Sequence, residues 1–293
     1  MSKNIIDYAY YPGCTSQEIT KEADFSTRKV AKSLGIGLHD MPKASCCGAG
    51  LLMDQNYELY MTVNARILAE AEEMGKDIVT ICATCLMVLS TMNWDFKRDP
   101  VIREKVNKNL RESGCSEYSG NVKVKHLLWV LIEDIGLENL KKQVKRPLDF
   151  LNIAPFYGCH SLRPSAALGF DDPENPNSLE RVIETLGGNV VTYEGRTKCC
   201  GFQGDLVNAD LAVEMTGTRL LDAKDNGAQC IVTPCPFCHI NLDSYQEQAE
   251  KKVEREIQVP IFHLAQMVGL SLGFTEDEMG LSRHIISPEK LFV

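Results

Sequence analysis

The sequence lacks the segments that export a protein or embed it in a membrane. Its first residues, MSKNIIDYAYYPGC, contain no apolar run followed by the small residues of a signal-peptide cleavage site. The longest mostly apolar stretch, Ile78 to Met92, is shorter than the roughly 20 residues that span a bilayer, and cysteine and threonine interrupt it. We therefore expect a cytoplasmic protein with no transmembrane segment, in a reducing compartment where disulfides are rare.

The sequence also lacks a positive net charge and two common cofactor-binding motifs, and this limits the chemistry that we expect of the chain. The chain has 31 Lys and Arg residues against 40 Asp and Glu residues, a net charge of −9, so we expect no nucleic-acid partner. It has no Gly-x-Gly-x-x-Gly motif and so gives no sign of binding a flavin or a nicotinamide. It also lacks the Cys-x2-Cys-x2-Cys-x3-Cys-Pro run of bacterial ferredoxins. Electrons for a redox reaction would then have to come from a partner protein.

The sequence does contain 12 cysteines, and ten of them form two copies of one pattern. Each copy has a single cysteine, then Cys-Cys-Gly, then Cys-x-x-Cys. The single cysteine precedes the pair by 31 residues in the first copy and by 39 in the second, whereas 34 residues separate the pair from Cys-x-x-Cys in both. The first copy consists of Cys14, Cys46, Cys47, Cys82 and Cys85, and the second of Cys159, Cys199, Cys200, Cys235 and Cys238. The matched interval indicates an internal duplication.

Residues other than cysteine follow the same repeat. Ile78-Val79-Thr80 and Ile231-Val232-Thr233 lie at one constant offset, and His126-Leu127 resembles His263-Leu264. Two cysteines, Cys115 and Cys230, fall outside the pattern, and we expect them to pack as ordinary small apolar residues.

Within each half, short apolar runs alternate with segments of helical periodicity. The runs predict strands at Ile5–Tyr10, Leu38–Met41, Asp77–Ile81, Asn152–Tyr157, Val190–Tyr193 and Cys230–Thr233. A capping-box pattern at Thr15–Glu18 predicts the start of a helix that ends at Gly35. This alternation predicts an α/β fold of two pseudo-symmetric repeats, each a small parallel sheet flanked by helices. A basic linker near Lys141–Pro147 would separate an N-terminal domain, 1–146, from a C-terminal domain, 147–293.

The repeated cysteines follow the predicted strands. Cys14, the Cys46-Cys47 pair and Cys82 each come soon after a strand, and sites in open α/β sheets form outside the carboxyl ends of strands. Several of these thiols also lie at predicted helix starts, where the helix dipole favours the thiolate that a metal needs. We therefore expect three loops to gather five thiols at one edge of each sheet.

Three chemistries could use thiols in this arrangement. Structural zinc takes four ligands, fewer than the five thiols of each half. Disulfide exchange through Cys-x-x-Cys would leave the adjacent cysteine pairs unused. An iron–sulfur cluster uses all five thiols, so we favour a cluster in each half. One cluster plus one zinc ion, and thiol redox chemistry, are the alternatives.

The duplicated pattern resembles the CCG-domain proteins, and the chain is similar in size to the B subunit of the heterodisulfide reductases of methanogenic archaea. The stretch Tyr157-Gly-Cys-His-Ser-Leu-Arg-Pro164 also resembles that protein. The resemblance implies a noncubane 4Fe-4S cluster in each half, two fused iron–sulfur units held by the five cysteines of one copy.

The same resemblance implies a catalytic subunit that reduces the heterodisulfide of coenzyme M and coenzyme B in methanogenesis. This small-molecule disulfide would lie between the clusters. Electrons would arrive from a flavin-containing subunit through a ferredoxin-like subunit, with a hydrogenase or formate dehydrogenase upstream. Basic residues beside the cysteines would bind the anionic groups of the substrate, namely Lys43, His160, Arg163, Arg196 and Lys198. The alternative is a non-catalytic subunit that relays electrons in, or anchors, a dehydrogenase or other oxidoreductase complex.

Overall fold

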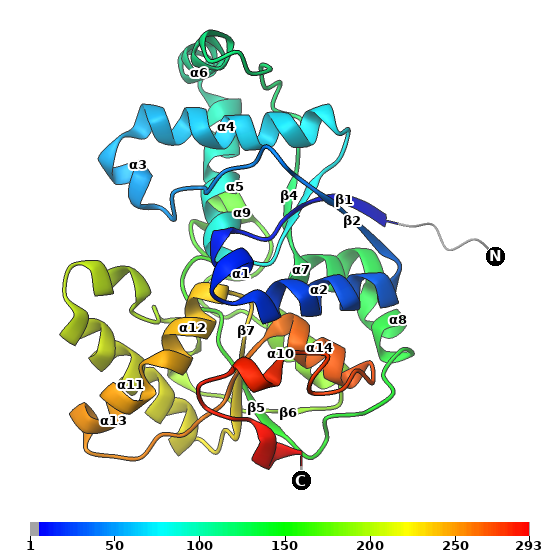
Figure 1. Cartoon of the computed structure of the whole chain (residues 1–293), viewed down its shortest axis with the longest axis vertical. Coiled ribbons are helices and arrows are strands. Elements are labelled where there is room, and N and C mark those ends of the chain that lie inside the picture. The colour runs from blue at the N-terminus through cyan, green and yellow to red at the C-terminus, as the bar shows by residue number, and fades with distance from the viewer. Residues whose placement is uncertain (1–5, 293) are drawn as a thin grey trace.

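Two four-stranded parallel sheets, one in each half, organise the protein (Figure 1). The computed structural model describes residues 6–292. The strand order is β2-β1-β3-β4 in the first sheet and β6-β5-β7-β8 in the second, so the two sheets have the same topology. All neighbouring strands run parallel. The predicted fold, two repeats with a parallel sheet flanked by helices in each, is confirmed.

The first half carries long helices between short strands. In chain order its elements are β1 (Ile6–Tyr11), α1 (Cys14–Glu18), α2 (Lys21–Leu34), β2 (Ile36–Asp40), α3 (Leu51–Gln55), α4 (Tyr57–Glu73), β3 (Ile78–Thr80), α5 (Ala83–Arg98), α6 (Pro100–Glu112), β4 (Val124–His126), α7 (Leu127–Trp129), the π-helical segment Val130–Gly136, and α8 (Leu137–Lys141). The three strands predicted here are present, and Ile5, the first residue of the first prediction, lies outside the described residues.

One helix prediction in this half is wrong at its start. We expected a single helix capped by Thr15, but α1 begins at Cys14 and ends at Glu18 before α2 begins at Lys21. No side chain caps α1, because Thr15 is buried and the chain enters the helix directly from Gly13. The predicted end is confirmed, since Gly35 adopts a left-handed conformation with φ 76°.

The second half repeats this order with shorter helices. Its elements are β5 (Asn152–Pro155), α9 (Ser165–Leu168), α10 (Ser178–Thr185), β6 (Asn189–Val190), α11 (Ala209–Asp225), β7 (Cys230–Thr233), α12 (Pro236–Ser244), α13 (Gln246–Val253), β8 (Ile261–His263) and α14 (Leu264–Ser271). The strand predicted at Val190–Tyr193 is only two residues long and begins at Asn189. The central strands β3 and β7 are entirely buried, as expected for parallel strands with helices on both faces.

The two halves pack against each other through helices and the C-terminal segment. Helix α2 contacts α14, and the two lie side by side in Figure 1. Residues after α14 fold back over α2, where Arg283 Nε donates to Glu22 Oε2 at 2.8 Å and Lys29 pairs with Glu278 at 3.2 Å. In the described part of the chain, each helix is too short or too polar to cross a lipid bilayer. The domain boundary at residue 146 stays a prediction.

Candidate metal centres

Each sheet places its cysteine loops at the carboxyl ends of its strands. Cys14 is the first residue of α1, Cys82 is the N-cap residue of α5, and Cys235 is the N-cap residue of α12. The Cys-Cys pairs lie in irregular loops that follow β2 and β6. The loops of one half meet because the carboxyl ends of parallel strands share one edge of the sheet.

Five thiols line one hollow in each half. The first hollow has a volume of about 220 Å³, and its cysteines are Cys14, Cys46, Cys47, Cys82 and Cys85. The second has a volume of about 330 Å³, and its cysteines are Cys159, Cys199, Cys200, Cys235 and Cys238. The structure therefore brings together the same two sets that the sequence pattern defines. That these ten thiols bind metal stays a prediction.

Two thiol pairs of the first hollow are close to each other. The Sγ–Sγ distance is 3.5 Å between Cys14 and Cys46 and 3.6 Å between Cys47 and Cys85. The cysteines at the corresponding positions of the repeat, Cys159, Cys199, Cys200 and Cys238, all line the second hollow. Corresponding cysteines thus surround the hollow in each half.

A backbone amide donates to the first thiol of each Cys-Cys-Gly loop. Gly48 N donates to Cys46 Sγ at 3.4 Å, and Gly201 N donates to Cys199 Sγ at 3.4 Å. Hydrogen bonds from the neighbouring thiols, first that of Cys159, and from Gly201 lower the pKa of Cys199 to about 2 despite its burial. A thiolate is the form of cysteine that binds a metal.

A glycine at the start of each set lets the backbone approach the sulfurs closely. Gly13 has φ 82° and Gly158 has φ 67°, conformations that side chains rarely adopt. A Cβ atom on Gly13 would lie 2.9 Å from Cys85 Sγ, and one on Gly158 would lie 3.0 Å from Cys238 Sγ. We did not predict this role from the sequence, although a glycine precedes the first cysteine in both copies and could have indicated it.

The donor set fits an iron–sulfur cluster. Within residues 6–292, no three His, Cys, Asp or Glu side chains converge as the ligands of a single metal ion do. In each half the thiols instead surround a hollow, and they include an adjacent pair that could reach two different metals. Thiolate ligands around such a space are the arrangement that a multi-iron cluster requires.

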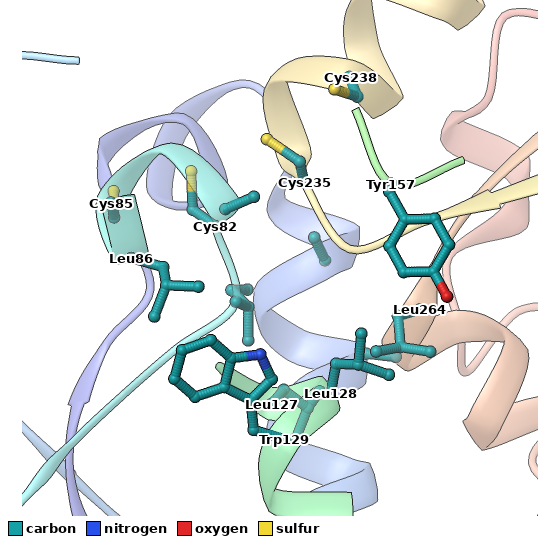
Figure 2. Packing of buried hydrophobic residues seen from close by; sticks show 14 of the residues in the cluster. Cys82, Cys85, Leu86, Leu127, Leu128, Trp129, Tyr157, Cys235, Cys238 and Leu264 are labelled. Atoms are coloured by element: carbon teal, nitrogen blue, oxygen red, sulfur yellow. The ribbon is translucent and has the colours of Figure 1, made fainter. Parts of the chain in front are cut away.

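The two hollows adjoin each other. Phe237 lines both of them. Thr84 Oγ1 of the first half lies 3.9 Å from Cys235 Sγ of the second half. In Figure 2 the four Cys-x-x-Cys thiols lie in one row, with Cys82 and Cys235 in the middle. The two predicted ligand sets are therefore neighbours.

Most of the basic residues that we expected beside the second hollow are held elsewhere. Only His160 lines it, with Nδ1 3.0 Å from Thr84 Oγ1, and burial lowers the pKa of His160. Of the other three, Arg163 pairs with Glu174 at 2.9 Å, Arg196 pairs with Glu180 at 3.2 Å, and Lys198 is exposed. Lys43, which we expected beside the first hollow, pairs with Glu73 at 3.0 Å. The predicted convergence on the second hollow is wrong because neighbouring carboxylates already neutralise two of its cations.

The fold and the thiol sites define a duplicated α/β protein with one cysteine-lined hollow per repeat. The sequence pattern of the cysteine-rich domain, CCG, matches residues 8–90 and 153–243. The chain belongs to this family.

Curated relatives span nearly the whole chain. The 8-methylmenaquinol:fumarate reductase membrane anchor subunit of Wolinella succinogenes is 39% identical over 97% of this chain and 99% of its own length. The B subunit of the ferredoxin/F420H2-dependent CoB-CoM heterodisulfide reductase of Methanosarcina acetivorans is 32% identical over 94% of this chain and 92% of its own. The chain is thus a CCG-domain subunit of the kind found in multi-subunit oxidoreductases.

A solved structure shares the fold at low sequence identity. A hypothetical protein from Helicobacter pylori aligns with a TM-score of 0.76 and 14% identity, over 96% of this chain and 52% of its own. At this identity the likeness shows the fold alone.

Proposed function

We propose that this chain is the iron–sulfur electron-transfer subunit of a multi-subunit oxidoreductase of the quinol:fumarate reductase type. Each half would hold one noncubane 4Fe-4S cluster. The relative named as a fumarate reductase anchor subunit supports this class of complex, because it matches end to end at higher identity than the heterodisulfide reductase relative described above. The protein would pass electrons between a membrane quinol and a partner that reduces the substrate.

The proximity of the two thiol sets carries the proposal. Thr84 Oγ1 of the first half lies 3.9 Å from Cys235 Sγ, Phe237 lines both hollows, and Cys82 and Cys235 are both buried, so the two ligand sets are neighbours inside the protein. A protein that relays electrons needs its redox centres close together and shielded from water. The duplicated fold supplies both conditions by placing the starts of α5 and α12 next to each other.

The cysteines differ in exposure along the proposed route of the electrons. Cys14 and Cys46 are exposed, so the first centre is the side from which a partner can exchange electrons. Cys235 and Cys238 are buried, and Phe237 between them in the sequence lines both hollows. When bound, the clusters would supply one-electron oxidation and reduction.

Heterodisulfide reduction is the second candidate. The heterodisulfide reductase relative at 32% identity favours it, and so does the junction of the hollows, where a disulfide between two clusters would lie. In that case the partners would be the ferredoxin-like and the flavin-containing subunits of such a reductase. Arg163 and Arg196, which we expected to bind its anionic groups, are paired with acids, and this weakens one argument for this substrate.

The two functions can be separated with a tagged chain purified anaerobically with its native complex. We expect the complex to reduce fumarate with a reduced menaquinol analogue. We expect the isolated, cluster-loaded chain not to cleave the coenzyme M–coenzyme B heterodisulfide with reduced viologen. Heterodisulfide cleavage by the isolated chain, without fumarate reduction by the complex, would reverse the order of the two candidates. A Cys47→Ser, Cys200→Ser variant is the matched control, because it should lack both centres.

A further inference from the structure

Two buried histidines cross the boundary between the halves in opposite directions. His126 ends β4, and its Nε2 lies 2.9 Å from the carbonyl oxygen of Pro234. His263 ends β8, and its Nε2 lies 3.0 Å from the carbonyl oxygen of Ile81. Pro234 directly precedes Cys235, and Ile81 directly precedes Cys82. Each histidine therefore contacts the Cys-x-x-Cys loop of the opposite half.

The second ring nitrogen fixes the direction of these bonds. Nδ1 of His126 accepts from Leu128 N at 3.0 Å, and Nδ1 of His263 accepts from Ala265 N at 3.2 Å. Because a backbone amide only donates, Nδ1 has no proton, and Nε2 carries the proton that it donates to the carbonyl. Burial lowers the pKa of both histidines to about 4, so both rings are neutral at neutral pH.

From this geometry we infer that His126 is a positioning residue for the second metal centre and His263 for the first. The carbonyl of Ile81 belongs to the peptide group that leads into Cys82, so a fixed carbonyl also fixes the backbone that presents this thiol. Cys82 and Cys235 have nearly the same backbone angles, φ −117° and ψ 117° against φ −131° and ψ 120°. The same hydrogen bond is therefore present twice, once from the first half to the second and once from the second half to the first.

Strand pairing does not explain why each histidine side chain contacts the opposite half. Within its own sheet, His126 is paired in register with Thr80, two residues before Cys82. Its side chain nevertheless extends to the other half, and the loop of its own half is held by Thr80 Oγ1, which accepts from Cys82 N at 3.3 Å. His263 is paired with Thr233 in the same way. The inference rests on a metal centre in each half, as proposed above, but on no particular electron partner.

Two substitutions distinguish the hydrogen bond to the opposite half from the hydrogen bond that caps the following helix. Asparagine at either position can still accept at the start of the following helix, as Nδ1 does, but it is too short to reach the opposite carbonyl. Glutamine is long enough to place an amide donor near the position of Nε2. The test is hydrogen exchange with mass spectrometry on the full chain purified anaerobically, for His126→Asn, His263→Asn and the two Gln variants.

We expect each Asn substitution to raise exchange in the half that does not carry it. His126→Asn should raise exchange in the segment 234–240 about five- to tenfold, the effect of losing one net hydrogen bond, and leave 81–87 unchanged. His263→Asn should do the reverse, and each Gln variant should restore most of the protection. Changes confined to the half that carries the substitution, or equal in both segments, would overturn the inference, as would a failure of glutamine to restore protection.

Iron release gives a second readout. In a Cys47→Ser chain, which should keep only the second centre, His126→Asn should speed the loss of iron to a chelator, and His263→Asn should not. In a Cys200→Ser chain the two effects should exchange places. Hydrogen exchange does not depend on the cluster type or on a partner, so a failure of the proposed function leaves that result interpretable, whereas uncrossed exchange contradicts the positioning role itself.

Discussion

The two halves hold corresponding thiols around their hollows but expose them differently. Both sheets have the same strand order, and the five cysteines of one repeat line each hollow. Cys14 and Cys46 are exposed, whereas their counterparts Cys159 and Cys199 are only partly exposed. The strands and helix starts therefore determine the ligand arrangement, and something outside the repeat determines access to it.

The first interval of the second half is longer than that of the first half. It has 39 residues against 31, and it contains α9, which packs on α5 of the first half. Phe170 in this segment stacks on Trp129, with 4.8 Å between the ring centroids. In the first half an open groove reaches Cys14 and Cys46. The difference in exposure thus coincides with a difference in the length of this interval.

The strongest test of the similarity is removal of one thiol from each Cys-Cys pair. We expect Cys47→Ser and Cys200→Ser each to lose about half of the bound iron, because each hollow should hold one of two four-iron clusters. Iron analysis of anaerobically purified protein measures this. Cys115→Ser and Cys230→Ser are the controls and should keep all the iron, since neither residue lines a hollow. Full iron content in Cys200→Ser would show that the halves are not equivalent.

Glycine substitutions should have the next largest effect. Gly13→Ala and Gly158→Ala would place a Cβ 2.9 Å and 3.0 Å from a cysteine sulfur, so each should reduce iron in its own half. Gly75→Ala and Gly227→Ala are matched controls, because both glycines have positive φ and neither has an atom within 4 Å of the added Cβ. The controls should show only the backbone strain, about 1 kcal/mol in the free energy of unfolding, with normal iron.

The difference in exposure predicts a smaller, one-sided effect. A Cys200→Ser chain, with the first centre only, should lose iron to a water-soluble chelator severalfold faster than a Cys47→Ser chain with the second. The reason is that Cys14 and Cys46 open onto the groove, whereas the second set is partly covered. The measurement is the rate of chelator absorbance under anaerobic conditions. Equal rates would mean that the exposure of Cys14 and Cys46 does not determine access to the first centre.

The smallest effect is a pH dependence that both halves should share. Burial lowers the pKa of His126 and His263 from 6.5 to about 4, so below pH 6.5 the unfolded chain takes up protons that the folded chain does not. Stability should therefore be full above pH 6.5 and fall as the pH decreases toward 4. Thermal unfolding midpoints across this range should fall less steeply in His126→Gln and in His263→Gln, by similar amounts. If only one substitution changes the pH dependence of the unfolding midpoint, the two histidines are not equivalent.

Sequence patterns predicted three strands of each sheet and missed the fourth, which lies at one edge. Ile78–Thr80 and Cys230–Thr233 stand out because both faces of these strands are covered and their apolar runs are continuous. The edge strands Val124–His126 and Ile261–His263 are three residues long and lead directly into helices. These two strands are identified by their pairing with β3 and β7.

The parts of the candidate sites that depend on which residues follow each strand in the sequence were predictable. Cysteines that follow parallel strands must meet at one edge, and all ten lie where this rule puts them. Contacts between distant segments were not predictable. Glu174 and Glu180 pair with the arginines expected beside the second hollow, and the crossing of His126 depends on how the halves dock. None of these contacts has a signature in spacing or composition.

The crossed histidines have a consequence for how the chain is built. In an isologous interface of a twofold homodimer, residue i of one copy contacts residue j of the other, and the reverse contact is also present. His126 with Pro234 and His263 with Ile81 satisfy that rule within one polypeptide. The protein is therefore organised as a homodimer whose two copies have been fused, and a half separated from its partner would lose the donor that fixes its own Cys-x-x-Cys loop.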